Sequence, residues 1–458
     1  MKLFTTTTAL LKRKLGARVV RTDDETRRAA SFDSSKIPFL PEAVIFPSHE
    51  AEIGVLLTLA NKHGVPVTTR GRGTTLTGAA APVRGGWVLD LLALNQIEID
   101  EEAGMAHVQC GAKVGDIHRA AEAKGWFYPP DPSSKDYCTI GGNIACNAGG
   151  MHGGKYGVTR DFIVALRGFL PTGEYVEWGT ATKKFSAGFN MRDLWIGSEG
   201  MLGVVTGAVL KLIPKPLHDL LLLLPFENME DACSAVSDIF KAGITPSALE
   251  FMERNAIEWS AQYLGESLSI PTNIQAHLLI ELDGRHLEVL YQDAETIAAV
   301  CEKYPIGEIL MADASHQKEQ LWKIRRNVAH AVKANSVYKE EDTVVPRFQM
   351  PLLLKTVKEI GKKYGFESVC YGHVGDGNLH VNIIRGNLSD DAWQTTVMEG
   401  ISELFQAVKK MGGTISGEHG IGYVQKNYLP IVFSETGLNL MRSIKQQFDP
   451  KGILNPGK

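Results

Sequence analysis

Two glycine-rich segments in the last fifth of the chain hold the residues best suited to chemistry. One reads GHVGDGNLHVN and contains His373 and His380, and the other reads SGEHGIG and contains Glu418 and His419. A lone histidine is usually a structural hydrogen-bonding residue, but here three of the thirteen histidines and a glutamate fall in two short segments. Two imidazoles and one carboxylate, with coordination positions left open, suit zinc, manganese or iron. The pattern therefore predicts a catalytic divalent-metal site.

The spacing of the histidines in the first segment predicts a strand, a tight turn and a second strand. His373 and His380 are seven residues apart, and three glycines flank or separate them, which makes a helix unfavourable. On one straight strand an odd spacing would place the two side chains on opposite faces. A Gly-Asp-Gly turn between two strands brings them together. His380 and Asn382, two residues apart, then share one face.

Three further glycine-rich loops in the first half of the chain predict a long ligand. The first, RGRGTTLTG, follows a predicted strand and offers backbone N–H groups and threonine hydroxyls to a phosphate. Its GxGxxxxG spacing is neither the Rossmann fingerprint nor a P-loop, so alone it could equally be a structural turn. The second, TIGGNIACNAGG, follows the stiff turn YPPDPSS and can run against a flat ring, and the third, GSEGMLGVVT, leads into a strand. Together the loops favour a dinucleotide.

Alternating helix and strand patterns must position these loops. A helix capped by Ser48 is predicted through about Lys62, because apolar residues recur along one helical face. Pro214 and Pro216 mark a boundary, after which longer helices alternate with strands, a pattern typical of α+β domains. Strands are predicted over residues 65–69, 87–92, 106–110, 162–169, 203–212 and 220–226. Later helices are predicted near residues 287–304, 317–335, 352–364, 391–411 and 438–448.

Composition and charge exclude several classes of protein. With a net charge of −4, the chain lacks the overall basic balance that binding to nucleic acid or an anionic membrane favours. No run of eighteen apolar residues predicts a membrane span. The basic N-terminus lacks the apolar core of a signal peptide, so a short first helix is expected, with an organellar transit peptide as the weaker alternative. The six cysteines form no CxxC pair, which predicts reduced thiols in a cytoplasmic protein and no iron–sulfur cluster in this chain.

Taken in this order and spacing, GRGTTLTG, PPDPSS, TIGGNIACNAGG and GSEGMLGVVT resemble the FAD domain of the vanillyl-alcohol-oxidase-type flavoproteins. The resemblance covers nearly the whole chain and ends in FDPKGILNPGK. It implies an α+β fold with a two-part FAD-binding domain over residues 1–215. An α+β substrate (cap) domain would follow over residues 216–425, and a C-terminal helical segment over residues 426–458 would pack back on the FAD domain.

The resemblance also implies which residues bind FAD. The first loop would hold the pyrophosphate, and the second would run along the flavin. No histidine lies in the first loop, so we expect non-covalent FAD, with Cys146 as a small packing residue beside the cofactor and not a tether. The implied cofactor-binding residues are Arg72, Gly73, Thr74, Thr75, Gly78, Pro132, Thr139, Gly142, Asn143, Cys146 and Val204.

The two histidine-containing segments resemble a subfamily that includes D-lactate dehydrogenases, the flavin subunit of glycolate oxidase and D-2-hydroxyglutarate dehydrogenase. This resemblance implies that a divalent metal (zinc, manganese or iron) is bound by His373, His380 and Glu418. It implies that His419 is the catalytic base and that Asn382 contacts the substrate.

A basic helical segment and an acidic segment bear on the substrate. LWKIRRN would by itself be a solvated basic face, but the subfamily has an arginine at the position of Arg325 that grips the substrate carboxylate, with Arg326 as the alternative. A guanidinium suits this role because it makes two parallel hydrogen bonds to a carboxylate. D-2-hydroxyglutarate dehydrogenases have a lysine at the position of Glu340, although Lys339 could compensate if the loop shifted. This departure favours a monocarboxylate substrate.

These features predict an FAD-linked dehydrogenase that oxidises a small D-2-hydroxy acid, with D-lactate or glycolate as the leading substrates. A neutral His419 would take the hydroxyl proton while the α-hydrogen leaves as hydride to the flavin N5, giving the 2-oxo acid. Electrons would pass to an iron–sulfur subunit, an electron-transferring flavoprotein, a quinone or a cytochrome. The expected location is the cytoplasm or, through a partner, the inner membrane, and a homodimer stays open. The alternatives are a D-2-hydroxyglutarate dehydrogenase, an electron-transfer subunit active only in a complex, and a flavin enzyme for alkyl-glycerone phosphate or aromatic alcohols.

Overall fold

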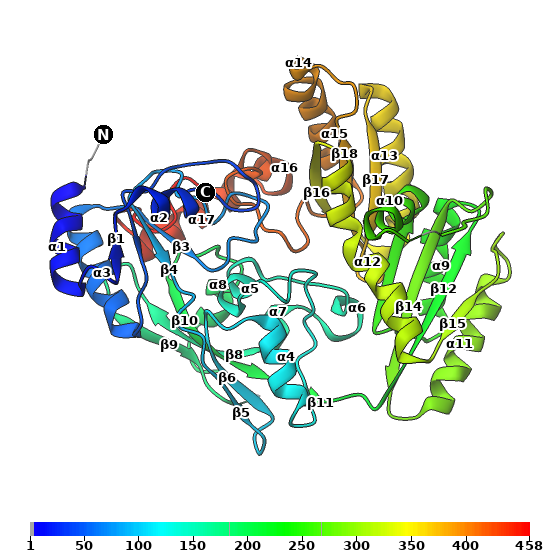
Figure 1. Ribbon diagram of the computed structural model, residues 1–458, viewed down its shortest axis with the longest axis horizontal. Helices are drawn as coiled ribbons and strands as arrows, with labels where there is room; N and C mark the ends of the chain where they lie inside the picture. The colour runs from blue at the N-terminus through cyan, green and yellow to red at the C-terminus, as the bar shows by residue number, and fades with distance from the viewer. Residues whose placement is uncertain (1–3, 183, 267) are drawn as a thin grey trace. The chain divides into compact units, whose positions relative to one another are not determined.

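The computed structural model describes residues 4–182, 184–266 and 268–458, which form two compact units (Figure 1). Unit 1 consists of Met1–Gly149, Val158–Lys215 and Glu418–Lys458. Unit 2 consists of Gly150–Gly157 and Pro216–Gly417. Both units combine helices with sheets, and the largest sheet of each unit is antiparallel, so the predicted α+β class is confirmed.

A four-stranded sheet in unit 1 leads into the first glycine-rich loop. Its strand order is β1-β2-β4-β3, with β2 and β3 parallel to β4 and β1 antiparallel to β2. The strands are β1 (Val20–Arg21), β2 (Ala43–Ile45), β3 (Val67–Arg70) and β4 (Trp87–Asp90). The helices of this region are α1 (Thr5–Leu15), α2 (Asp24–Ala29) and α3 (Glu50–His63).

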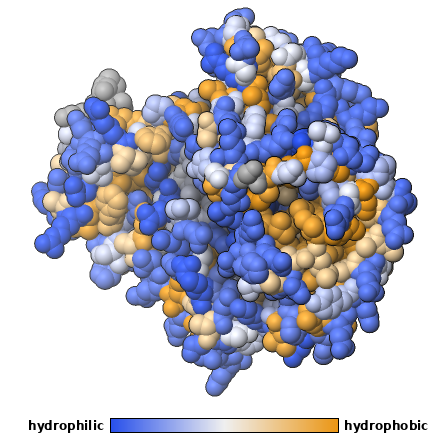
Figure 2. Space-filling model, turned by 45° about the vertical axis from the view of Figure 1, so that its right-hand side comes forward, coloured by the Kyte–Doolittle hydropathy of each residue, from blue (hydrophilic) through white to orange (hydrophobic). Residues whose placement is uncertain are grey.

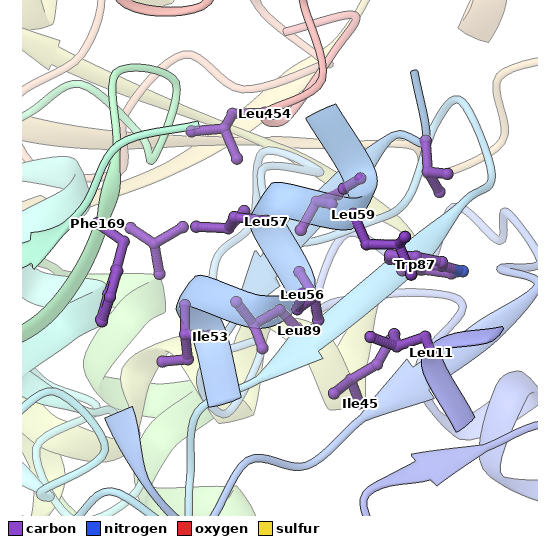
Figure 3. Packing of buried hydrophobic residues seen from close by; sticks show 14 of the residues in the cluster. Leu11, Ile45, Ile53, Leu56, Leu57, Leu59, Trp87, Leu89, Phe169 and Leu454 are labelled. Atoms are coloured by element: carbon purple, nitrogen blue, oxygen red, sulfur yellow. The ribbon is translucent and has the colours of Figure 1, made fainter. Parts of the chain in front are cut away.

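Helix α3 is the helix predicted from Ser48, but it begins later and is capped differently. The Glu52 carboxylate accepts hydrogen bonds from the backbone N–H groups of Ser48 (2.7 Å) and His49 (3.3 Å). The prediction that Ser48 caps the helix was wrong, because the cap position is His49, one residue later, and the Glu52 side chain reaches back to it. The apolar face of α3 packs into a buried cluster (Figure 3). This cluster includes Leu11, Ile45, Ile53, Leu56, Leu57, Trp87, Leu89, Phe169 and Leu454.

A five-stranded antiparallel sheet forms the second layer of unit 1, in the order β5-β6-β10-β8-β9. Its strands are β5 (Ile97–Asp100), β6 (Met105–Gln109), β8 (Ile163–Phe169), β9 (Tyr175–Gly179) and β10 (Val204–Lys211). Short β7 (Trp126–Phe127) pairs with β11 (Ile213–Pro214). The helices are α4 (Val114–Glu122), α5 (Ile140–Cys146), α7 (Thr159–Phe162) and α8 (Met191–Trp195).

The C-terminal segment of unit 1 folds back onto β3. The Val67 N–H donates to Ile453 O (2.8 Å), and the Asn455 N–H donates to Val67 O (2.9 Å). The Asp449 carboxylate accepts from the N–H groups of Ile453 (3.0 Å) and Leu454 (2.7 Å), which fixes the final turn. This segment contains η2 (Lys426–Tyr428), α16 (Leu429–Val432) and α17 (Glu435–Phe448).

Unit 2 is built on a seven-stranded antiparallel sheet in the order β15-β12-β14-β13-β17-β18-β16. Every residue of β13 is buried, so this central strand is covered on both faces. The strands are β12 (His218–Phe226), β13 (Ala248–Glu253), β14 (Ala276–Gly284), β15 (Leu310–Ala312), β16 (Tyr338–Val344), β17 (Glu367–Gly372) and β18 (Asn378–Ile384).

Helices cover this sheet, and one pair matters for the site. Helices α10 (Arg254–Leu264) and α12 (Ser315–Asn335) form a buried cluster with one face of the sheet. The cluster includes Ile257, Val328, Met252 and Tyr371. The helix predicted near residues 391–411 is two helices, which meet at Thr395. The helices of unit 2 are α6 (Gly153–Tyr156), α9 (Met229–Lys241), α10 (Arg254–Leu264), α11 (Leu287–Cys301), α12 (Ser315–Asn335), η1 (Arg347–Gln349), α13 (Met350–Tyr364), α14 (Asp390–Gln394) and α15 (Thr396–Lys410).

The surface mixes hydrophilic side chains with separate apolar patches (Figure 2). Among the described residues, every helix is too short or too polar to cross a membrane. All six cysteines are free thiols, and five of them are buried.

Candidate active site

The first glycine-rich loop of unit 1 leaves β3 in an irregular, partly exposed conformation. Gly73 (φ 67°) and Gly78 (φ 75°) adopt left-handed backbone conformations, which favour glycine. Arg72 is exposed, while Thr74 and Thr75 are half-buried. The carbonyl of Thr77 accepts from the N–H groups of Tyr423 (2.8 Å) and Val424 (3.0 Å) in the C-terminal segment. The C-terminal segment thus fixes one end of the loop, while the donor side chains of Arg72, Thr74 and Thr75 remain accessible to solvent.

The second glycine-rich segment is not the loop that its composition predicted. Residues Ile140–Cys146 form helix α5, and the Thr139 hydroxyl caps it by accepting from Gly142 N–H (3.4 Å). The threonine cap favours the helix. Gly141 lets the helix approach Cys110, whose Cβ would lie 2.8 Å from a Cβ at this position. Asn143 is buried, and its Nδ2 has no hydrogen-bond partner among the described residues.

The remaining expected cofactor residues of unit 1 are spread over neighbouring elements. Gly142 is exposed, Pro132 is buried in its turn, and Val204 is buried at the start of β10. The Cys146 thiol lies 3.4 Å from Gly142 O. Burial raises the pKa of this thiol, so it is protonated at neutral pH and a poor nucleophile.

Glu199, in the third glycine-rich loop, organises the segment that follows Glu418 and His419. It is a non-glycine residue with a positive φ (50°), and its buried carboxylate accepts from the N–H groups of Ile421 (2.6 Å) and Gly422 (2.9 Å). A side chain on Gly420 would collide with this carboxylate. The sequence places Glu199 in a glycine-rich loop expected to bind the cofactor but does not predict this anchoring role.

The histidine segment of unit 2 is the predicted strand–turn–strand. β17 ends at Gly372, β18 begins at Asn378, and the turn between them carries His373. The rings of His373 and His380 are both buried, with centroids 5.3 Å apart and planes at 85°. The Asn378 N–H donates to His373 O (3.1 Å), which tightens the turn.

The strand register places a set of polar side chains on one face of the sheet. His380 pairs with Tyr371 on one side and Asp342 on the other, and Asn382 pairs with Val369 and Glu340. Directly paired residues point to the same face. His380 Nδ1 lies 3.8 Å from the Glu340 carboxylate and 3.7 Å from the Asp342 carboxylate.

Helix α12 covers this face and contributes Arg325. Of the two candidate arginines, Arg325 is buried (3% exposed), whereas Arg326 is exposed and lies with its Cζ 5.5 Å from the Trp322 ring. The Arg325 Cζ lies 5.1 Å from the centre of the Tyr371 ring, a cation–π contact. The geometry therefore brings Arg325, and not Arg326, to the histidines.

Glu250, which the sequence motifs do not single out, is the carboxylate that joins Arg325 to His373. Glu250 lies in the middle of β13 and is fully buried. Its Oε2 is 2.5 Å from Arg325 Nη2, and its Oε1 is 2.7 Å from His373 Nδ1. A glutamate at an interior position of the apolar strand ALEFME was the available signal, because an acid there must find a partner.

Asp342 fixes the loop that leads to the second histidine segment. Its Oδ2 accepts from Gly417 N–H (2.8 Å) and Ser416 Oγ (3.1 Å), and its Oδ1 accepts from Asn378 Nδ2 (2.7 Å). Glu418 follows Gly417 directly in the chain and is the first residue of the last segment of unit 1. Glu418 and His419 thus lie between two anchored stretches of chain, Ser416–Gly417 and residues 421–422.

The immediate surroundings of Glu418 within unit 1 are also defined. A Cβ on Gly149, at the end of the second glycine-rich segment, would lie 3.1 Å from Glu418 Oε2, so glycine leaves room for this carboxylate. His419 Nε2 lies 3.9 Å from Glu418 Oε1.

Several buried polar groups on the histidine face of unit 2 are unsatisfied by the described residues. Arg325 Nε has no acceptor, and neither polar atom of the fully buried Asn382 carboxamide makes a well-formed hydrogen bond. Buried polar groups are otherwise almost always paired, so such a cluster is typical of a ligand site.

The charges on this face fit a cation. Glu250, Glu340 and Asp342 contribute three carboxylates against the single guanidinium of Arg325. Buried charges are paired or coordinate metals, so a divalent cation would balance the surplus, and the two imidazoles supply suitable nitrogen ligands. In unit 1, the positive-φ glycines and the unpartnered Asn143 Nδ2 fit a polar, ring-containing cofactor.

The chain matches two protein-family models and several curated relatives. Residues 41–179 match the family described as "FAD binding domain", and residues 215–458 match "FAD linked oxidases, C-terminal domain". Over 437 residues the chain is 40% identical to the glycolate oxidase subunit GlcD of Bacillus subtilis, covering 94% of this chain and 92% of the relative. It is 35% identical to the D-lactate dehydrogenase of Anaerostipes hadrus, with 91% and 89% covered.

Among solved structures, p-cresol methylhydroxylase with substrate bound superposes with a TM-score of 0.82 at 17% identity, covering 99% of this chain and 96% of that one. At this low identity the likeness shows the fold alone.

Proposed function

The chain belongs to the FAD-linked oxidases, and from this premise we propose that it is a dehydrogenase that oxidises a small D-2-hydroxy acid to the 2-oxo acid. The observation that carries the proposal is the buried face of unit 2, where Arg325, His373, His380 and Asn382 come together in a chain with an FAD-binding domain. Relatives named as a glycolate oxidase subunit and a D-lactate dehydrogenase support this substrate class. A subunit that only transfers electrons would need no buried arginine and histidine pair of this kind.

In this proposal His373, His380 and Glu418 bind a divalent metal. The buried histidine pair, the surplus of carboxylates and the anchoring of Gly417 next to Glu418 support this set. His419, the next residue, accepts the proton of the substrate hydroxyl. When bound, the metal makes that hydroxyl more acidic and FAD accepts the hydride from the α-carbon.

Arg325 and Asn382 orient the substrate. The unused Nε–H of Arg325 and the unpaired amide of Asn382 are available for a carboxylate and a hydroxyl. A guanidinium can bind a carboxylate while one of its other N–H groups stays on Glu250, because it has five donors.

D-lactate or glycolate fits better than D-2-hydroxyglutarate. Glu340 lies on the histidine face, where its carboxylate would repel a second substrate carboxylate. Lys339 cannot compensate from its present position, because it is on the opposite face of β16 and its Nζ lies 4.9 Å from the Trp393 ring.

We propose that FAD is bound non-covalently by the three loops of unit 1. The protonated Cys146 thiol and the donor-rich first loop support this arrangement. The proposed contacts are Arg72, Gly73, Thr74, Thr75, Gly78, Pro132, Thr139, Gly142, Asn143, Cys146 and Val204. An external acceptor then reoxidises the flavin, and the name of the Bacillus subtilis relative as a subunit supports an acceptor on another chain.

Anaerobic flavin bleaching tests the proposal. The FAD-loaded protein, treated with EDTA and then supplied with Zn²⁺, Mn²⁺, Fe²⁺ or no metal, is mixed with D-lactate, L-lactate, glycolate, D-2-hydroxybutyrate or D-2-hydroxyglutarate. We expect metal-dependent bleaching by D-lactate or glycolate, lost in H380N and kept in H330N, a substitution at an exposed position. Full activity after chelation would remove the metal role, and bleaching by L-lactate alone would overturn the stereochemistry.

A further inference from the structure

Glu250 is a fully buried carboxylate whose two oxygens contact different functional side chains. Oε1 lies 2.7 Å from His373 Nδ1, and Oε2 lies 2.5 Å from Arg325 Nη2. Burying an ionised carboxylate costs several kcal/mol unless charges and hydrogen bonds compensate it. A well-packed apolar residue would spare this cost, so the acid is expected to serve the site and not stability alone.

The contact with His373 determines which ring nitrogen is available. Oε1 of Glu250 faces Nδ1 of the imidazole at 2.7 Å, so the hydrogen bond between the two side chains is made through that nitrogen. A carboxylate at Nδ1 holds the proton on that nitrogen and leaves the lone pair on Nε2. Metal-binding histidines commonly donate their second N–H in this way, which fixes the ring and increases its basicity.

The contact with Arg325 fixes the guanidinium from one side. Glu250 binds Nη2, and the Tyr371 ring lies 5.1 Å from Cζ. An arginine side chain held in this way has already lost much of its rotamer freedom. Less freedom remains to be lost when a carboxylate binds.

We propose that Glu250 is a positioning residue that holds the metal ligand His373 and the substrate anchor Arg325 in one buried array. Glu250 lies on β13, whereas Arg325 lies on α12 and His373 in the turn after β17, so it connects three elements. This inference rests on the proposed function, because it takes the roles of His373 and Arg325 from there.

The chain offers a matched control on the same strand. Glu253 is also buried (4% exposed), and its Oε1 lies 2.6 Å from Lys358 Nζ. Being three residues from Glu250, it points to the other face of the sheet, away from the histidines. E253Q therefore removes a buried charge from the same strand without touching the array.

The test is calorimetric titration of EDTA-treated, FAD-loaded protein with Zn²⁺. We expect E250Q to raise the dissociation constant of Zn²⁺ about 10- to 100-fold, the usual effect of losing the partner of a metal-binding histidine. E253Q should stay within about twofold of the wild type. Equal weakening by both variants, or an E250Q affinity equal to that of the wild type, would overturn the inference while leaving the metal site in place. A wild type that binds no Zn²⁺ would instead refute the proposed function and the inference with it.

A second measurement needs neither metal nor substrate. In ¹⁵N-histidine NMR spectra, His373 of the metal-free wild type should carry its proton on Nδ1; a proton on Nε2 alone would contradict the inference. If E250Q fails to fold, E250D replaces it in the titration. The shorter aspartate keeps the charge, but its carboxylate lies about 1.5 Å, one carbon–carbon bond, closer to β13, so it cannot contact both His373 and Arg325. E250D should bind Zn²⁺ about tenfold more weakly than the wild type, and wild-type affinity would count against the inference.

Discussion

Asp342 is the residue whose replacement most directly tests how the second histidine segment is held. The D342A substitution removes a fully buried carboxylate that accepts three hydrogen bonds, from Gly417 N–H, Ser416 Oγ and Asn378 Nδ2. The first two bonds tie the loop directly before Glu418 to β16. We therefore expect D342A to loosen this loop much more than the rest of unit 2.

The size of the effect follows from these contacts. A hydrogen bond to a charged group contributes about 1.5–3 kcal/mol. Losing the two bonds to the loop at the low end of this range costs about 3 kcal/mol of local opening free energy. Because about 1.4 kcal/mol corresponds to a factor of ten, amide exchange in the loop should accelerate roughly 100-fold.

Hydrogen–deuterium exchange measured by mass spectrometry, on peptides covering residues 414–420, checks this expectation. T343V is the control, because the buried Thr343 hydroxyl donates to Leu379 O (2.9 Å) and faces away from the loop. T343V should leave exchange in residues 414–420 unchanged. If D342A exchanges there as slowly as the wild type, or if T343V accelerates it equally, Asp342 is not the anchor. Zn²⁺ affinity should fall in D342A but not in T343V.

Three further predictions concern substrate and pH. R325K should raise the KM for D-lactate about tenfold or more in stopped-flow flavin reduction, because a lysine cannot make two parallel hydrogen bonds to a carboxylate. R326K, at an exposed position, should leave the KM unchanged. E340K should raise kcat/KM for D-2-hydroxyglutarate relative to D-lactate by about tenfold or more, because a lysine at this position attracts the second substrate carboxylate that Glu340 repels. An unchanged ratio in steady-state assays would contradict the placement of Glu340. Burial lowers the pKa of His277 to about 4, and the charge of Arg254 adds to the shift. In the unfolded chain His277 has the ordinary histidine pKa of about 6.5, so the free energy of unfolding decreases as the pH falls from about 6.5 towards 4. The expected decrease is about 2 kcal/mol between pH 7 and 5. Urea unfolding should show a smaller decrease over this range in H277Q than in the wild type.

Much of the architecture was predictable because it depends on local sequence. The four flavin-type motifs identified the vanillyl-alcohol-oxidase-type family, which the family matches and the fold of p-cresol methylhydroxylase confirm. Glycine density and odd spacing predicted the hairpin that carries His373 and His380, and the structure has it. Local composition also misled, since TIGGNIACNAGG was interpreted as a loop although its first half is helix α5, capped by Thr139. The capping Thr139 hydroxyl is visible in the sequence, but the density of glycine after it favours a loop.

The sequence by itself thus determined the family, the strand–turn–strand and the short list of residues that could do chemistry. Only the tertiary structure decided how the residues of unit 2 are connected. Glu250 reaches Arg325 and His373 across 75 and 123 positions, and Asp342 reaches Gly417 across 75. Such contacts are set by strand register and by the helix that covers the sheet, neither of which has a local sequence signal. The packing of α12 on the sheet decided between Arg325 and Arg326. The strand register placed Lys339 away from the histidines, because successive residues of a strand point to opposite faces.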